Sequence, residues 1–440
     1  MFRIYYKFFI FLSCFLAEYA CANEIMSLSQ CLEAGMKNNP TLQASQFKTE
    51  ASQQDVKVAR ADFFPTLASS YSLNRIDSNY ANGPTKSDYI DQTIHSATVK
   101  MTQIIYAGSR ISNNYDRAKF MELASQAERD SVKLELAYNI ETTFYKMMKA
   151  KQDVITASEA VTRLSESAKA AEAFFRKELV PYVDVLKAKV DLADADNQLS
   201  VAKNNENRQR ITLFSLMNLP VNPTLEFIDE TNTTIGERPT FEDCFRFASE
   251  HRPDIKSLDF QRQASDKQAE IAISKYLPVV RLDAGYYDAN NDYDTLGASL
   301  LGSYDLDQTN RYWLVGLTVT WDLFDGGRSW YESEKSSLDS QRLGALRQEA
   351  HNTIATGIRK ALYSWQEAEQ RLASSADALI AAKENYTSED NRLKAGVSTM
   401  TALLDAQSRL VRAQVNKSNA TLDYHLARSE LKFMTGGKEN

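Results

Sequence analysis

The segment YWLVGLTVTWDL at residues 312–323 alternates between apolar and mostly polar side chains. A period of two is typical of a β-strand, because successive side chains point to opposite faces. The apolar face carries a tryptophan near each end, Trp313 and Trp321. A tilted strand of about 9 to 11 residues spans a bilayer, and tryptophan is enriched at its interfaces. The pattern predicts a membrane-spanning strand, although the alternation alone equally fits a soluble sandwich strand.

Three more segments share this period, and they are expected to pair as two β-hairpins. The predicted strands cover residues of about 66–76, 95–106, 279–288 and 312–323. Four strands are too few for a sandwich core, and a single-chain membrane barrel needs about eight. An open sheet edge in lipid leaves backbone groups unpaired. The barrel must therefore be shared between chains. The strand count alone does not decide between two chains, with eight strands, and three chains, with twelve.

The two hairpins occur at the same point of a duplicated sequence. A shift of 213 residues places Cys31 on Cys244 and Pro65 on Pro278, and a shift of 218 places Leu216 on Met434. Each copy is far longer than a solenoid repeat, so the chain is a duplicated half-protein. The expected organisation is a first repeat at 23–218, a Pro-containing linker at 219–240, a second repeat at 241–436 and a tail at 437–440.

Long helices make up most of each repeat. A helical stretch at 27–63 or 241–276 precedes Pro65 or Pro278, because the residue before a proline avoids the α region. A helical hairpin follows at about 110–218 or 328–436. Residues 110–178 lack proline and glycine and would form a helix roughly 100 Å long. The hairpin tips are expected near 178–184 and 395–402, since Pro181 and Gly396 stop helices.

Residues 1–22 have the pattern of a secretory signal. Arg3 and Lys7 precede an apolar run, and small residues precede the expected cleavage before Asn23. Lipid attachment to Cys21 is the alternative, but residues 18–20 are a poor approach to a modified cysteine. Beyond residue 22 no run of eighteen apolar residues occurs, so any membrane span is expected to be β.

The composition argues against several classes of function. The formal net charge is −7, and no basic stretch suggests nucleic-acid binding. The four histidines are scattered, and no metal-binding, phosphate-binding or Ser-His-Asp pattern occurs, so neither an enzyme nor a cofactor is predicted. Residues 288–294 mimic a calcium loop but lack its Gly and Glu. With residues 74–94, they are interpreted as polar extracellular loops. Cys31 and Cys244 are interpreted as buried apolar residues, and a disulfide between them is the alternative.

The duplicated order of helix, β-hairpin, long helix and returning helix resembles the TolC family of outer-membrane efflux proteins. The motifs that support this are Pro65 and Pro278 before the strands and the Gly-Ser-Arg and Gly-Gly-Arg segments, at 108–110 and 326–328, after them. The resemblance implies a mostly α fold with β, in which a homotrimer forms a twelve-stranded outer-membrane β-barrel continued by a twelve-helix periplasmic α-barrel. It places the protein in the outer membrane of a Gram-negative bacterium, in contact with lipid. It also implies a periplasmic membrane-fusion adaptor and an inner-membrane ABC or proton-driven pump as partners.

The resemblance also suggests residues for the tunnel entrance. Segment 396–406 resembles a family pattern with two aspartates, so Asp405 carries over, while Ala402 stands at the first aspartate position. In the first repeat, Asp184 stands at an aspartate position of the same family pattern. Ser398 replaces the usual entrance arginine, and Lys187 or Lys394 is expected to substitute for it. The alternative is that both aspartates merely favour a helix N-terminus. Adaptor docking is expected near four tip residues, Leu179, Val180, Gly396 and Val397.

The predicted function is an exit duct of a tripartite efflux or type I secretion system, which passes small molecules or polypeptides to the exterior. The main alternative is a periplasmic coiled-coil scaffold or adaptor-like protein that does not span the membrane. A passive porin is a weaker alternative, because it does not account for helices of this length.

Overall fold

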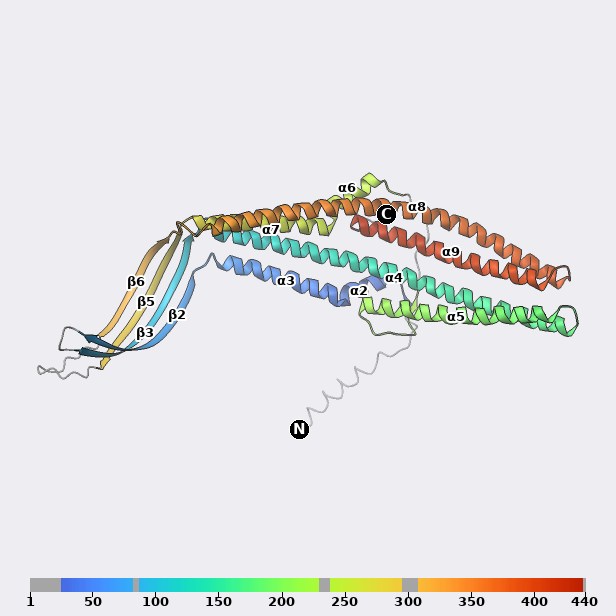
Figure 1. Ribbon diagram of the computed structural model, residues 1–440, viewed down its shortest axis with the longest axis horizontal. Coiled ribbons are helices and arrows are strands. Elements are labelled where there is room, and N and C mark those ends of the chain that lie inside the picture. The colour runs from blue at the N-terminus through green and yellow to red at the C-terminus, as the bar shows by residue number, and fades with distance from the viewer. Residues whose placement is uncertain (1–24, 82–86, 229–237, 295–307, 438–440) are drawn as a thin grey trace, which may run out of the picture. The chain divides into compact units, whose positions relative to one another are not determined.

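A computed structural model describes residues 25–81, 87–228, 238–294 and 308–437 (Figure 1). The signal peptide with Cys21, most of the C-terminal tail and part of the linker lie outside these residues. The chain divides into two compact units. The hairpin unit comprises Met1–Gln46, Glu128–Ile255 and Glu349–Asn440, and the sheet unit comprises Phe47–Ala127 and Lys256–Gln348.

The sheet unit contains one four-stranded antiparallel sheet in the order β2-β3-β5-β6. Its strands are β2 (Thr66–Ala81), β3 (Ser87–Tyr106), β5 (Val279–Asp294) and β6 (Gln308–Thr320). The two repeats meet where β3 pairs with β5 (Figure 1). Among the described strands, β2 and β6 each have one neighbour, so both edges of the sheet are open.

Three strands extend further toward the β2–β3 or β5–β6 turn than the sequence pattern indicated, and the fourth strand, β6, both begins and ends earlier in the sequence than expected. The interpretation of 74–94 and 288–294 as loops is wrong for most of these residues, which belong to β2, β3 and β5. Their polar side chains bond across the ladder, as when Arg311 Nε donates to Asp288 Oδ2 at 3.1 Å. The last strand ends at Thr320 rather than Leu323, because Thr320 pairs with Val279, the first residue of β5.

The two faces of the sheet differ in polarity. Partners in adjacent strands lie on the same face, and the register aligns Leu67, Met101, Ala284 and Val315 across all four strands. Large apolar residues of this face are exposed in the single chain, including Leu67, Val99, Met101, Trp313, Val315, Leu317 and Val319. The opposite face carries mainly hydroxyl and amide side chains, such as Thr98, Thr102 and Thr318.

The turn from β6 into α8 (Arg328–Lys394) is stabilised by one carboxylate. Asp325 accepts hydrogen bonds from the backbone N–H of Gly327 at 3.0 Å and of Ser329 at 2.9 Å, and from Ser329 Oγ at 2.5 Å. The hydrogen bonds from Ser329 hold the pKa of Asp325 below its usual value. Gly326 and Gly327 have positive φ angles of 73° and 81°, which glycine adopts without steric cost.

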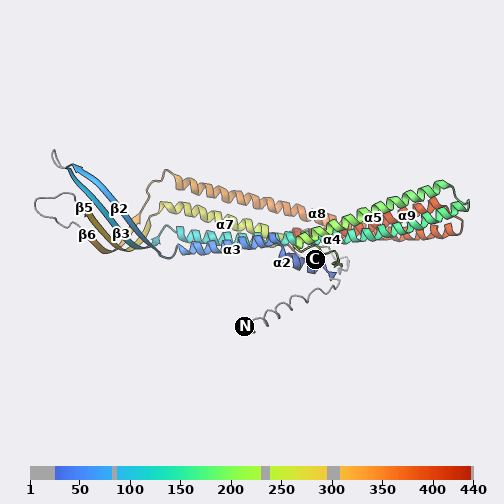
Figure 2. The same ribbon diagram turned by 90° about the horizontal axis from the view of Figure 1, so that it is seen from below.

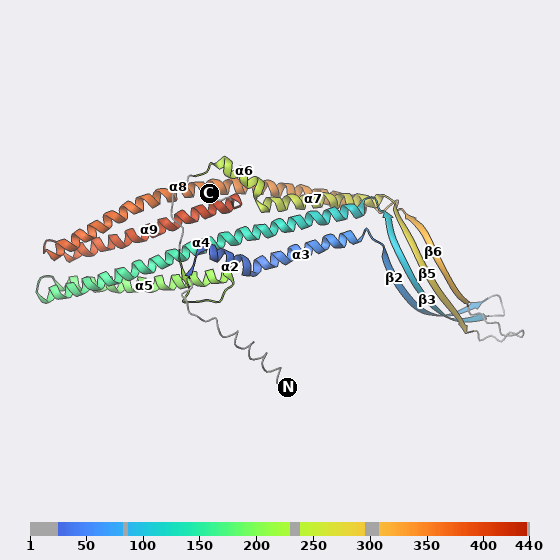
Figure 3. The same cartoon turned by 180° about the vertical axis from the view of Figure 1, so that it is seen from behind.

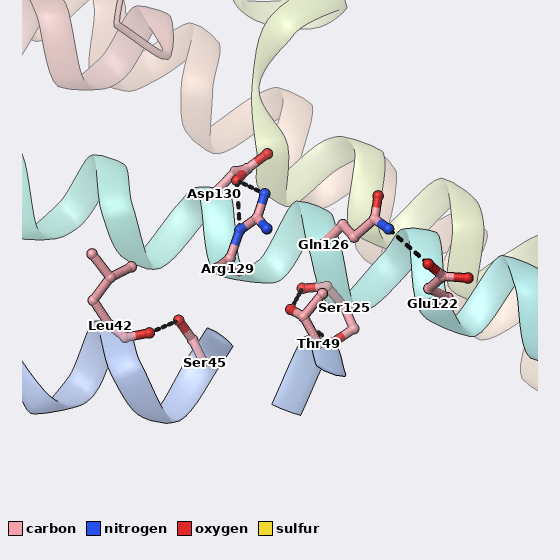
Figure 4. A network of polar contacts seen from close by, with 8 residues as sticks. All are labelled: Leu42, Ser45, Thr49, Glu122, Ser125, Gln126, Arg129 and Asp130. Atoms are coloured by element: carbon pink, nitrogen blue, oxygen red, sulfur yellow. Dashed lines mark hydrogen bonds and ion pairs between the residues drawn. The ribbon is translucent and has the colours of Figure 1, made fainter. Parts of the chain in front are cut away.

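Small side chains bring helices together in the sheet unit. Its helical segments come from α3 (Pro40–Ala61), α4 (Arg110–Arg176), α7 (Pro253–Ile273) and α8. Thr49 Oγ1 donates to the Ser125 carbonyl at 3.3 Å and joins α3 to α4 (Figure 4). Ser265 Oγ donates to the Ser336 carbonyl at 2.9 Å and joins α7 to α8.

Two helical hairpins form most of the hairpin unit. One is made by α4 with α5 (Tyr182–Met217) and the other by α8 with α9 (Met400–Thr435), as Figures 2 and 3 show. The short helices α2 (Leu28–Asn38) and α6 (Phe241–His251) precede α3 and α7. Among the described residues, no helix is long and apolar enough to cross a membrane.

Each opening stretch, expected as one helix, is broken before a proline. Asn39 and Arg252 precede Pro40 and Pro253 and have extended ψ angles of 124° and 126°. The steric restriction on a residue before proline explains both breaks. In the expected linker, β4 (Glu226–Phe227) pairs in parallel with β1 (Ile25–Met26).

Each repeat builds its own apolar core in the hairpin unit. The first contains Cys31, Ile140, Phe144, Met147 and Leu213, and the second contains Cys244, Ile358, Trp365, Tyr424 and Leu431. Both cysteines are fully buried and form no disulfide. Burial raises the pKa of the Cys31 thiol to about 12, so this thiol stays protonated and behaves as a small apolar side chain.

Candidate pore entrance and docking site

The α4–α5 turn ends its helix with a left-handed residue. Glu178 has a φ of 60°. Its N–H donates to the Phe175 carbonyl at 2.8 Å, and the Leu179 N–H donates to the Phe174 carbonyl at 2.9 Å. These two bonds form a Schellman motif, which satisfies carbonyls at the helix end. Pro181 then precedes the first residue of α5.

The α8–α9 turn repeats this geometry. Gly396 has a φ of 74°, and its N–H donates to the Leu393 carbonyl at 3.0 Å. The Val397 N–H donates to the Arg392 carbonyl at 2.9 Å. The two hairpin tips therefore share one backbone conformation, although Glu178 stands where the second tip has Gly396.

The same substitution pattern recurs at other turns of the first repeat. Among the described residues of the first repeat, the non-glycine residues with positive φ are Ser109, Glu178 and Asn218. The second repeat has Gly327, Gly396 and Gly436 at the equivalent positions, all with positive φ. A side chain in this conformation costs about 1–2 kcal/mol. The first repeat therefore carries backbone strain that the second repeat avoids.

We expect Glu178→Gly to stabilise the protein by up to about 1 kcal/mol, because the strain removed, about 1–2 kcal/mol, exceeds the entropy that glycine adds to the unfolded chain, about 0.4–1 kcal/mol. The matched control is Gly396→Ala, where an added Cβ meets no atom within 4 Å. Its cost is therefore conformational and about 1 kcal/mol of destabilisation. Thermal unfolding followed by circular dichroism compares the two variants. A loss of stability in Glu178→Gly would contradict the strain argument.

The four residues expected to dock an adaptor lie at these two turns. Leu179 and Val397 occupy the same position of the Schellman motif, and their exposed fractions are 66% and 65%. Gly396 is exposed and Val180 is half-buried. Leu179 and Val397 thus give each turn an exposed branched aliphatic side chain at the same position.

The two hairpins pack together behind their tips. The buried residues of this cluster are Ala168, Ala171, Val185, Ala188, Met400 and Leu403. Alanines at the contact let helices approach closely. The arrangement holds the tips of the two hairpins together within the hairpin unit.

The two candidate entrance aspartates have different surroundings. Asp184 lies in the first turn of α5 and is 3.9 Å from Lys187. Asp405 lies beyond the first turn of α9, has a side chain that is 67% exposed, and pairs with Arg409 at 3.2 Å. A favourable interaction with the helix dipole therefore explains the position of Asp184 at a helix N-terminus, but it does not explain the position of Asp405.

The expected bonding residues all have partners in their own hairpin. Ser398 Oγ donates to Glu389 Oε2 at 2.5 Å, and Arg392 Nη1 donates to Glu389 Oε1 at 2.8 Å. Lys394 donates to Asp390 at 2.7 Å, and this hydrogen bond raises the pKa of Lys394. Sequence reasoning did not single out Glu389, because it lies nine residues before Ser398 in a segment rich in charges.

Comparisons with known proteins agree with this architecture. The family model described as outer membrane efflux protein matches residues 32–219 and 246–437. The chain is 23% identical to the solvent efflux pump outer membrane protein SrpC of Pseudomonas putida, over 93% of this chain and 85% of SrpC. It is 22% identical to the outer membrane protein TolC of Vibrio cholerae, over 97% of this chain and 94% of TolC.

A solved structure shows the same fold. The CmeC outer membrane channel of Campylobacter jejuni superposes with a TM-score of 0.80 at 18% identity, over 93% of this chain and 85% of CmeC. The expected resemblance to the TolC family is confirmed, and the scaffold alternative is not favoured. With the family model covering both repeats, this chain belongs to the outer membrane efflux protein family.

Proposed function

We propose that this chain is one of three protomers of an outer-membrane exit duct in a tripartite efflux or type I secretion system. The observation that carries the proposal is a four-stranded sheet with an apolar face and two open edges, joined to helices of 67 residues. In the duct, the sheets form a shared barrel and the helical hairpins form a periplasmic tunnel. The two repeats, at 23–218 and 241–436, contribute alike to both parts.

The open edges support a shared barrel. In lipid, the unpaired N–H and C=O groups of β2 and β6 need partners. Pairing the β2 edge of one chain with the β6 edge of the next satisfies both. Three copies give twelve strands, which is the number that family resemblance favours. The exposed apolar face, with Trp313 and Leu317, then contacts lipid.

The hairpin tips are proposed as the tunnel entrance and the docking site of a periplasmic membrane-fusion adaptor. Exposed Leu179 and Val397 supply apolar contacts, while Val180 and Gly396 complete the two turns. An inner-membrane ABC or proton-driven pump would supply the energy. The cargo is then a small molecule or a polypeptide that the pump delivers to the tunnel.

Single-channel recording tests the proposed function directly. Detergent-purified mature protein is expected to insert into planar bilayers as trimeric pores with small, cation-favouring conductance. The small size follows from a narrow entrance, and the cation preference from its carboxylates. A protein that stays soluble without detergent and forms no pores would support the scaffold alternative.

The double variant Asp184→Ala with Asp405→Ala is expected to lower both the resting conductance and the cation preference of the pore. Three chains would remove six carboxylates from the entrance, so both ion attraction and mutual repulsion fall. Lys187 and Arg409 lose their partners, which further weakens cation entry. The ratio of potassium to chloride permeability is expected to fall about twofold or more.

Asp196→Ala is a control for this variant, because Asp196 lies on α5 farther from the tip. It is expected to leave conductance and selectivity unchanged. If the double variant keeps both the resting conductance and the cation preference of the parent pore, Asp184 and Asp405 do not form the entrance ring.

A further inference from the structure

A charged cluster lies on the polar face of the sheet, far along the sequence from the hairpin tips. Asp283 on β5 is only 8% exposed. Its Oδ1 accepts a bond from Thr102 Oγ1 at 3.0 Å and lies 3.2 Å from Lys100 Nζ. Its Oδ2 accepts bonds from Arg281 Nε at 2.9 Å and from Thr318 Oγ1 at 3.3 Å. Side chains from β3, β5 and β6 thus converge on one carboxylate.

The cluster has an excess of positive charge. Lys100 and Arg281 face the single carboxylate of Asp283, which leaves a net charge of +1. Following the register from Thr66 to Thr320, the other side chains that the structure describes on this face are uncharged. The side chains of Lys100 and Arg281 are 39% and 42% exposed, so both cations remain accessible.

The position of the cluster keeps it open in a closed barrel. Lys100 lies on β3 and Arg281 and Asp283 on β5, and both strands are paired on two sides within one chain. Pairing between chains involves only the β2 and β6 edges. The opposite face of the sheet is apolar and exposed, so in the proposed duct it contacts lipid and the polar face lines the lumen.

We propose that three copies of this cluster form a cationic ring in the barrel lumen, with a net charge of +3, that binds multivalent anions such as phosphate-rich solutes. The inference rests on the proposed trimeric duct. Carboxylate Asp283 orders the two cations, and their excess charge attracts the anion. The charge that lines the duct is then negative at the hairpin tips, where the carboxylates lie, and positive in the barrel.

The test measures block of single-channel current by inorganic tripolyphosphate, added on the side of the membrane nearer Ala81 and Asp294, the last residues of β2 and β5. The parent pore is expected to show reversible block. The double variant Lys100→Met with Arg281→Gln changes each cluster from +1 to −1, so the blocking concentration is expected to rise about tenfold or more. Asp283→Asn changes each cluster to +2 and keeps a side chain of similar shape, so it is expected to lower the blocking concentration.

The matched control is Arg311→Gln, because Arg311 pairs with Asp288 on the opposite face of the same sheet. Tripolyphosphate is expected to block the Arg311→Gln pore at the same concentration as the parent pore. Equal block in the parent pore, the double variant and Asp283→Asn would overturn the cationic ring while leaving the duct intact. A parent protein that forms no pores would overturn both the ring and the proposed function.

Discussion

Replacing Trp365 with alanine is expected to destabilise the hairpin unit by about 3–5 kcal/mol. Trp365 is 1% exposed and packs edge-to-face on Tyr424, with ring centroids 6.4 Å apart. It belongs to the core of the second repeat, together with Ile358 and Leu431. Alanine would leave a large cavity among these side chains, and long helices cannot easily collapse into it. Thermal and denaturant unfolding in detergent would measure the loss.

Trp365→Phe separates the loss of apolar volume from any polar role of the indole. In the part of the chain that the structure describes, Trp365 Nε1 has no hydrogen-bond partner. Phenylalanine therefore breaks no hydrogen bond and keeps an aromatic ring against Tyr424. Its expected cost is about 1–2 kcal/mol. If Trp365→Phe cost as much as Trp365→Ala, packing volume would not be the source of the stability.

Local patterns in the sequence were sufficient to predict the order of the elements. Prolines explain why helices stop before the strands, and alternation around Trp313 explains which face of β6 is apolar. Strand ends were harder to predict, because polar residues such as Asp288 and Asn290 look like loop residues in isolation. A neighbouring strand supplies their partners, as when Thr309 donates to Asn290 at 2.8 Å. That information is absent from the local pattern.

The candidate sites show the same limit. Gly396 and Pro181 marked the hairpin tips because they restrict or free the backbone directly. The hydrogen bond between Ser398 and Glu389 forms because the turn folds back on α8. The nine-residue separation of the two side chains in the sequence does not predict it. Likewise, Lys100 and its partner Asp283 lie 183 positions apart in the sequence, so no local pattern links them. Such contacts become visible only when β3 and β5 are paired.

Leu317→Arg is expected to prevent stable trimers in the outer membrane. Leu317 lies between Trp313 and Val319 on the apolar face, and its exposed fraction is 65% in the single chain. At the bilayer midplane an arginine on this face costs about 2–4 kcal/mol per chain. Three copies would lose roughly 6–12 kcal/mol if the costs add, which is comparable with the stability of a folded domain. The yield of heat-resistant trimer from outer-membrane fractions measures this effect.

Leu314→Arg is the matched control, because the same replacement is made three residues away on the polar face of the same strand. Leu314 is 48% exposed, and the proposed lumen can hydrate an arginine there, so trimers are expected at nearly the parent level. In a soluble scaffold, both leucines would face water and both arginines would be tolerated. A tolerated Leu317→Arg would therefore contradict a lipid-facing surface, whereas loss of trimers in that variant alone would assign the two faces of the sheet to lipid and lumen.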